Sequence, residues 1–202
     1  MGAQKFRAYP KNISIKSEIL ISFCVLLLGA TLGLIAKLTD SVSIIGEIGT
    51  EIGIWIFVAS LIAGYSRYPL SAAINVFLFF CAMLAAYYIY GQMALGFFPR
   101  SYFIGWLVVT LLSPLGGAII WFSRADGIVG SAITALPTAL LFAHGYPVFY
   151  SHRITLLLSI IMGIILCLIL PKTVKQKAIA FTISLPLAFA VVVMRLMNYL
   201  PF

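Results

Sequence analysis

Few residues of this chain have side chains suited to acid–base or metal chemistry. Among 202 residues there are 5 Asp and Glu, 2 His and 3 Cys, against 13 Lys and Arg. The acids Glu47 and Glu51 lie close together in the sequence, and His144 is followed at some distance by His152. Carboxylates and imidazoles bind zinc, but the histidines do not have the His-x-x-x-His spacing of a helical zinc site. We therefore predict no metal site and no cofactor.

Sequence motifs of common catalytic sites are missing as well. The chain has no Gly-x-Ser-x-Gly turn, no glycine-rich phosphate loop and no His-Glu-x-x-His helix. Each of these motifs places a nucleophile, a phosphate or a metal at a fixed point of a fold. Serine, phosphate and zinc-protease catalysis therefore have no support in the sequence, and we predict no catalytic residues. An enzyme is the less expected class.

Several polar residues lie beside or inside apolar runs, where they are candidates for contacts with other helices, lipid or a ligand. Asn75 lies about two turns inside an apolar run, and a buried amide needs partners on neighbouring helices. Arg67 is flanked by Tyr65 and Tyr68, whose rings can stack on its guanidinium or help to hold a lipid headgroup. The candidate polar contacts are Glu47, Glu51, Arg67, Asn75 and Arg100.

The composition excludes an ordinary soluble domain. Hydrophobic residues make up 63% of the chain and charged residues only 9%. In soluble domains roughly half of the residues are hydrophobic and roughly a quarter are charged. Most of the surface must therefore contact lipid, and the bilayer is the expected partner. The net charge of +8 does not indicate nucleic acid, because the basic residues are scattered singly between apolar runs.

Positions of the charges divide the chain into apolar runs that predict an all-α, polytopic bundle of transmembrane helices. The short hinge Arg67-Tyr68-Pro69 separates two of these runs and makes them a tight hairpin. The second run is shorter than the roughly 20 residues of a spanning helix, so six spans plus a short re-entrant segment is the alternative. The seven expected spans are residues 19–36, 52–66, 70–90, 102–122, 128–149, 154–170 and 178–194. Residues 1–18 form a basic cytoplasmic tail, and residues 19–202 form a single transmembrane domain.

The distribution of Lys and Arg favours seven spans with a cytoplasmic N-terminus, since cytoplasmic loops are enriched in these residues. In that topology Lys37, Arg100, Arg153 and Arg195 lie outside, and all other basic residues lie inside. With six spans, the numbers of Lys and Arg residues on the two sides of the membrane are nearly equal. Tyr, Trp and Phe gather near the predicted outer ends of the spans, which is typical of an aromatic belt at the membrane interface.

Small residues and prolines within the runs indicate how the helices pack. Gly29 and Gly33 are four residues apart, a spacing that lets two helices approach closely. Pro114, Pro137 and Pro186 each interrupt an apolar run and free backbone carbonyls. Broken helices line the substrate sites of many transporters, although proline is common in membrane helices generally.

Part of the chain resembles a family of small bacterial polytopic membrane proteins that has no assigned activity. The resemblance covers roughly residues 52–115 and is carried by GIW at 53–55, YSRYPL at 65–70, AAINVFLFF at 72–80 and FPRSYF at 98–103. It implies a multi-pass protein of the bacterial inner membrane. In size, apolarity and basic charge the chain is also similar to the substrate-binding membrane subunits of energy-coupling-factor transporters. Those subunits have six spans and a different alanine pattern.

Three functions are consistent with these patterns. The first is a small-molecule transporter, or its membrane-embedded substrate-binding subunit, with other membrane or ATPase subunits as partners. The alternative is a non-catalytic membrane partner or assembly protein, favoured by the lack of Asp, Glu, Lys and Arg in the middle of the spans. A lipid-modifying enzyme is the least expected, and it would need acids or histidines that converge at one membrane interface.

Overall fold

The computed structural model describes Arg7, Gly49 and residues 14–40, 51–96, 98–151 and 153–194, and all of its regular structure there is helical. Seven of the helices are 14 residues or longer, and they correspond in order to the seven apolar runs. They are α1 (Ile15–Thr39), α3 (Ile52–Tyr65), α4 (Pro69–Leu95), α5 (Arg100–Trp121), α6 (Ile128–Gly145), α8 (Ile154–Ile169) and α9 (Val174–Val193). The short helices η1 (Phe122–Arg124) and α7 (Val148–Ser151) lie in connections.

Local sequence explains several of the helix boundaries. Pro69 is the first residue of α4, where a missing backbone N–H costs nothing. Gly96 ends that helix with a φ of 63°, a left-handed conformation that favours glycine. At the start of α9, Thr173 and Gln176 form a reciprocal capping box. These signals fix the hinge between α3 and α4 and the turn between α8 and α9.

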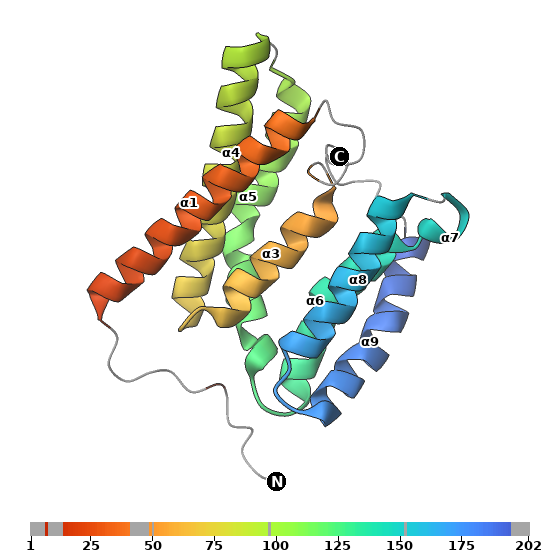
Figure 1. Cartoon of the computed structure of the whole chain (residues 1–202). Coiled ribbons are helices and arrows are strands. Elements are labelled where there is room, and N and C mark those ends of the chain that lie inside the picture. The colour runs from red at the N-terminus through yellow and green to blue at the C-terminus, as the bar shows by residue number, and fades with distance from the viewer. Residues whose placement is uncertain are drawn as a thin grey trace.

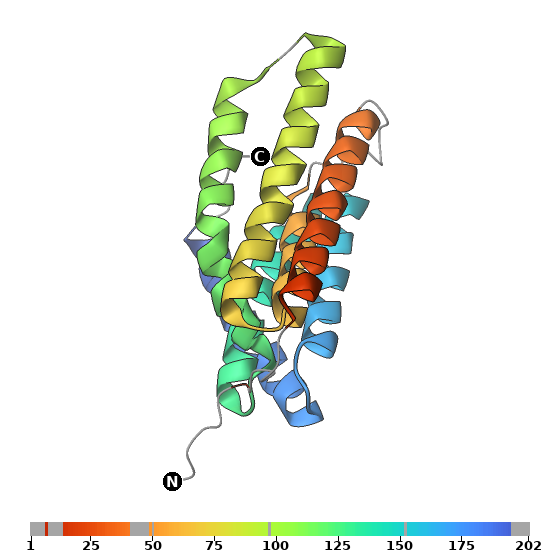
Figure 2. The ribbon, with the colours of Figure 1, turned by 90° about the vertical axis from the view of Figure 1, so that its left-hand side faces the viewer.

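The long helices form two groups of three on either side of α3. Helices α1, α4 and α5 make one group and α6, α8 and α9 the other (Figure 1). The shorter helix α3 packs against α4 and α5 on one side and against α6 and α8 on the other. Successive long helices run in alternating directions, as the view turned by 90° also shows (Figure 2). α3 therefore connects the two groups through most of its length.

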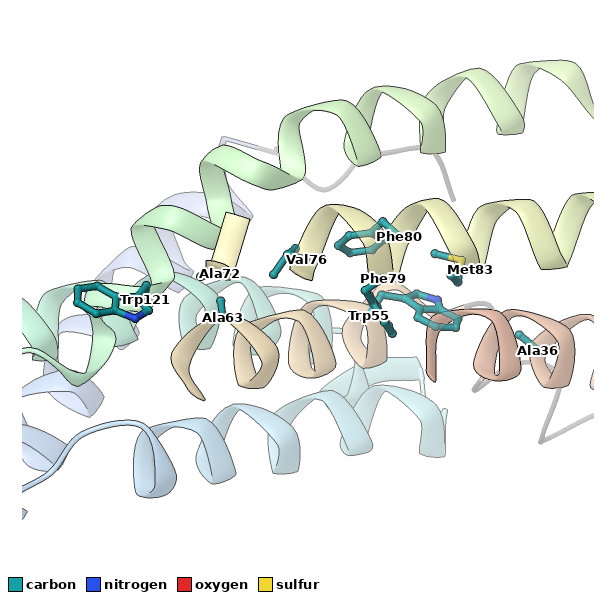
Figure 3. Packing of buried hydrophobic residues seen from close by; sticks show 9 residues of the cluster. All are labelled: Ala36, Trp55, Ala63, Ala72, Val76, Phe79, Phe80, Met83 and Trp121. Atoms are coloured by element: carbon teal, nitrogen blue, oxygen red, sulfur yellow. The ribbon is translucent and has the colours of Figure 1, made fainter. Parts of the chain in front are cut away.

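The largest buried cluster of hydrophobic residues lies between α3 and the group formed by α1, α4 and α5. Figure 3 shows Trp55 of α3 beside Phe79 of α4, with Trp121 of α5 at one end of the cluster and Ala36 of α1 at the other. Close packing of α1 on α4 depends on the predicted small-residue pair, because Gly29 and Gly33 are buried against the backbone of Phe79 and Met83. The packing role predicted for these two glycines is confirmed.

Several predicted boundaries are wrong by a few residues. The first helix begins at Ile15 and α9 begins at Val174, four residues earlier than predicted in each case. The run 128–149 contains two helices, since α6 ends at Gly145 and α7 follows, but together they form one candidate membrane span of 24 residues, Ile128–Ser151. The boundaries were predicted from the last charge before each run, but Lys, Gln and Glu are good helix formers and extend a helix beyond its apolar part.

Five of the described helices are long and apolar enough to cross a membrane, namely α1, α4, α5, α6 and α9 with short extensions at some ends. The helices α3 and α8 are apolar but shorter, with 14 and 16 residues. Pro114, Pro137 and Pro186 all lie inside continuous helices. The prolines are therefore accommodated within helices, as is common in membrane proteins, and they give no support to a transporter-like unwound site.

Candidate functional site

Three side chains from three helices form one hydrogen-bonded series where α6 ends and α8 begins, which we call the His144 end of the bundle. His144 Nδ1 lies 3.0 Å from Ser159 Oγ of α8. His144 Nε2 lies 2.8 Å from Oε2 of Glu51, the N-cap residue of α3. When Nε2 carries the ring proton and donates it to the carboxylate, Nδ1 is an acceptor for the Ser159 hydroxyl. The order is therefore serine, imidazole, carboxylate.

Among the described residues, Glu51 has two further contacts, both at the start of α8. Thr155 Oγ1 donates to Glu51 Oε1 at 3.3 Å, and Arg153 Nη2 lies 3.4 Å from the same oxygen. Burial alone would raise the pKa of Glu51. The hydrogen bond and charge of His144, the charge of Arg153 and the Thr155 hydroxyl outweigh burial and lower the pKa below its ordinary value of 4.5. The carboxylate is therefore ionised at neutral pH.

The local structure of each helix explains why these groups meet. A carboxylate at the N-cap of α3 is stabilised by the positive end of the helix dipole, and an imidazole in the last turn of α6 suits the negative end. Thr155 and Ser159 are four residues apart in α8, so they share one helix face. Opposite them, α3 has Gly53, where a β-carbon would lie 2.5 Å from Ser159 Oγ. A glycine at this position is what allows α3 to approach α8.

The series is enclosed by protein. Ser159 is fully buried, and the side chains of His144 and Glu51 are only 9% and 16% exposed. A hydroxyl, a base within hydrogen-bond distance and an anion that orients the base are the parts of a nucleophilic catalytic site. The same bonds also join α3, α6 and α8, which is how buried polar side chains act in most helix bundles.

A second polar cluster lies at the opposite end of the bundle, the Arg7 end, where α3 and α5 end. Arg7 donates to the carbonyl oxygens of Gly64 and Trp121 at 2.9 and 2.6 Å and to that of Ser66 at 3.1 Å. Its guanidinium also lies 4.3 Å from the Trp121 ring centroid. Burial and the nearby charge of Arg124 lower the pKa of Arg7 to about 10, so it stays charged at neutral pH. Arg7 thus caps the C-terminal ends of two helices at once.

The candidates Arg67 and Asn75 lie in a polar network at this same end. Arg67 forms an ion pair with Glu18 of α1 at 3.1 Å, and Ser71 of α4 donates to Glu18 at 2.7 Å. Deeper in the bundle, Asn75 accepts a hydrogen bond of 2.7 Å from Ser22 of α1. This is the interhelical bond expected of an amide in an apolar helix. The network fastens α1 to α4.

The predicted polar residues therefore do not form one site. Glu51 lies at the His144 end, Arg67 and Asn75 lie at the Arg7 end, and Arg100 is an exposed first residue of α5. Glu47 and His152 lie outside the described residues. Within the described part of the chain, no three His, Cys, Asp or Glu residues are grouped closely enough to hold a metal ion.

Sequence reasoning missed Ser159 and Thr155, whereas it did group Glu51 with His144 among the conceivable metal ligands. A signal was present, because Thr155 and Ser159 form a polar face of two residues four apart in an otherwise apolar helix. A site assembled from three separate helices leaves no local motif.

The described part of the chain is all-helical, and several of its helices are long and apolar enough to cross a membrane. Comparison with protein families, with curated proteins and with solved structures finds no match for this chain.

Proposed function

We propose that this protein is a membrane enzyme that cleaves or transfers an acyl ester at one membrane interface, with Ser159 as nucleophile and His144 as general base. The observation that carries the proposal is the hydrogen-bonded series from Ser159 through His144 to Glu51. A carboxylate and a histidine that converge at one end of the bundle are the feature that a lipid-modifying enzyme requires and that a passive assembly protein does not.

The proposed topology has seven spans, with the N-terminus in the cytoplasm and the His144 end facing outward. All seven long helices alternate in direction, so α3 and α8 pass through the bundle although they are short (Figure 1). Basic residues among the described ones favour the Arg7 end as the cytoplasmic side. That end holds Arg7, Lys16, Arg67, Arg124, Lys172, Lys175 and Lys177, while the His144 end holds Lys37, Arg100 and Arg153.

The proposed reaction has two steps. In the first, Ser159 Oγ attacks the ester carbonyl carbon while its proton passes to His144 Nδ1. The C–O bond then breaks, and the leaving alcohol takes that proton from the imidazolium. In the second, water, activated by His144, attacks the acyl-serine and releases the carboxylic acid, or another alcohol accepts the acyl group. Relative to the usual serine triad, the two ring nitrogens have exchanged roles.

Glu51 acts in this scheme as a positioning residue. By accepting the Nε2 proton it keeps Nδ1 free to act as a base, and its negative charge stabilises the imidazolium. Thr155 in turn orients the Glu51 carboxylate. Because Gly53 lies directly against Ser159, the acyl group enters by separating α3 from α8 at the His144 end.

Hydrolysis of p-nitrophenyl octanoate by the purified protein in detergent micelles tests the proposal. Wild-type protein should release nitrophenolate well above the detergent blank, and Ser159→Ala and His144→Gln should lower the rate by about 100-fold or more. The matched control is Ser184→Ala, because Ser184 is a fully buried serine of α9 that bonds only within its own helix among the contacts described for it. An inactive wild-type protein, or a Ser159→Ala variant as active as Ser184→Ala, would refute the proposal.

Transport of a small molecule is the second candidate, and one observation favours it. α3 contacts both three-helix groups and has a polar cluster at each of its ends, at Glu51 and at Ser66. Such an arrangement suits two groups that open alternately at opposite ends. Uptake of radiolabelled amino acids, sugars and nucleosides into proteoliposomes tests it. Uptake equal to that of empty liposomes would count against transport, and no activity in either assay would leave a non-catalytic membrane partner.

A further inference from the structure

We infer that the acyl donor is a glycerophospholipid whose phosphate is held by Arg153 while its ester carbonyl reaches Ser159. This inference rests on the proposed function and on the proposed topology. It names the substrate class from the position of the two residues along α8, from the residues around them and from the lipid-facing side of that helix.

Arg153 and Ser159 lie at the depths of two different chemical groups of a phospholipid. Arg153 is the N-cap residue of α8, and Ser159 follows six residues later, which places it about 9 Å deeper along the helix axis. Each headgroup layer of a bilayer is roughly 5 to 7 Å thick outside a hydrocarbon core of about 30 Å. With Arg153 at phosphate level, Ser159 lies just below the headgroups, where the glycerol esters of a phospholipid are located.

Aromatic residues mark this level independently. Tyr146, Phe149 and Tyr150 lie on the connection that precedes Arg153, and the Tyr146 ring lies with its centroid 6.1 Å from that of Phe149 and 5.9 Å from that of Tyr150. All three are well exposed, Phe149 by 76%. Exposed aromatic side chains at the end of an apolar helix are typical of the membrane–water interface. The start of α8 is therefore at headgroup depth.

The Arg153 side chain is 51% exposed while it contacts Glu51 Oε1 at 3.4 Å. A guanidinium is suited to bind phosphate through two parallel hydrogen bonds. Its position beside Glu51 links phosphate binding to the same carboxylate that orients His144. A phosphate bound here would therefore sit next to the hydrogen-bonded series of Ser159, His144 and Glu51.

The fatty chains of such a lipid would lie along α8. On this helix Leu157, Ile161, Ile164 and Leu168 are each more than 40% exposed and recur at helical spacing. They form an apolar stripe on the lipid-facing side of α8, about half a turn around the helix from the buried Ser159, and the stripe runs toward the Arg7 end. A lipid with its phosphate at Arg153 can therefore place one acyl chain along this stripe, while the chain whose ester is cleaved enters between α3 and α8.

The test compares two pure diacyl lipids with the same fatty chains, phosphatidylglycerol and diacylglycerol, each mixed into detergent micelles with the full-length protein. Fatty acid release is measured by mass spectrometry. Wild-type protein should release fatty acid from phosphatidylglycerol at least tenfold faster than from diacylglycerol. Arg153→Gln should reduce this ratio to below about threefold, and Arg153→Lys should give an intermediate ratio. Arg100→Gln, which removes another cation at the same end, should leave the ratio unchanged.

The outcomes separate the two proposals. Equal release from both lipids by wild-type protein, or a ratio that Arg153→Gln does not change, would overturn the phospholipid assignment while leaving the ester chemistry intact. No Ser159-dependent release from either lipid, together with no hydrolysis of p-nitrophenyl octanoate, would instead refute the proposed function itself.

Discussion

A β-carbon at Gly53 of α3 would lie 2.5 Å from the Ser159 hydroxyl of α8. Real atoms do not approach so closely, so Gly53→Ala must push α3 away from α8 or turn the serine. We expect a loss of about 1 to 3 kcal/mol in the free energy of unfolding. Adding Ser159→Ala to this variant should recover part of the loss, because the clashing oxygen is then gone.

The control for this pair is Gly116→Ala in α5, where no atom lies within 4 Å of the added β-carbon. Gly116→Ala should leave thermal unfolding in detergent unchanged or raise its midpoint slightly, since alanine favours a helix. Equal midpoints for Gly53→Ala and Gly116→Ala would show that α3 and α8 are not packed as described.

The pH dependence of stability should report the Glu51 contacts. Because folding lowers the pKa of Glu51 below 4.5, its ionised form stabilises the folded state fully above that pH, and the contribution is lost as the pH falls through the folded-state value. His144, Arg153 and Thr155 are the groups that face this carboxylate. Glu51→Gln should have a lower thermal unfolding midpoint than wild type at pH 7. This difference in midpoint should narrow as the pH falls below 4.5.

Thermal unfolding midpoints of both proteins between pH 3 and pH 7 would measure this. A matched substitution, Asp126→Asn, removes an acid that is 60% exposed and paired with Lys172, so it should change the midpoint little. A gap between Glu51→Gln and wild type that is constant with pH would mean that Glu51 is not held as an ion by its neighbours.

How much of this structure was predictable depends on the range of each interaction. The helical class, the seven apolar runs and the hairpin at Arg67 followed from composition and from prolines and charges that act locally. The Gly29 and Gly33 seam was also a local pattern. The series Glu51, His144 and Ser159 joins three helices far apart in sequence, so only the packing of α3 between α6 and α8 brings it together. Local patterns contain no information about that packing.

Prolines left two readings open at the level of sequence, a broken helix or a proline accommodated within a membrane helix. Pro114, Pro137 and Pro186 each lie inside a continuous helix, which is the second reading. In a bundle, neighbouring helices and nearby Ser and Thr hydroxyls can satisfy the freed carbonyls.

Asn75→Leu tests the network at the Arg7 end. The Asn75 amide bonds to Ser22 of α1 at 2.7 Å and to the Ser66 hydroxyl at 3.3 Å, so leucine removes a link between α1 and α4. Interhelical hydrogen bonds in membranes contribute about 0.6 kcal/mol on average and about 1 to 2 in model peptides. The unfolding midpoint should fall modestly, and Ser22→Ala should give part of the same effect. An unchanged midpoint in both variants would show that the bond does not stabilise the bundle.

Cysteine accessibility in intact cells tests the orientation. In a background where Cys24, Cys81 and Cys167 are replaced, Lys175→Cys at the Arg7 end should be protected from an impermeant maleimide. Arg100→Cys at the His144 end should react, because positive charge is concentrated on the cytoplasmic side. Permeabilised cells provide the control, since both positions should then react. Labelling of position 175 from outside would reverse the proposed topology.

The most direct measurement of the central claim is the site of reaction with a fluorophosphonate, which forms a stable adduct with activated serines. After incubation of the purified protein, peptide mass spectrometry should find the adduct on Ser159 in wild-type protein, and labelling should fall at least tenfold in His144→Gln because the base that activates the hydroxyl is gone. The other fully buried serines, Ser123, Ser131 and Ser184, should remain unmodified. Absence of an adduct on Ser159, or equal labelling of Ser159 in wild type and His144→Gln, would contradict the account.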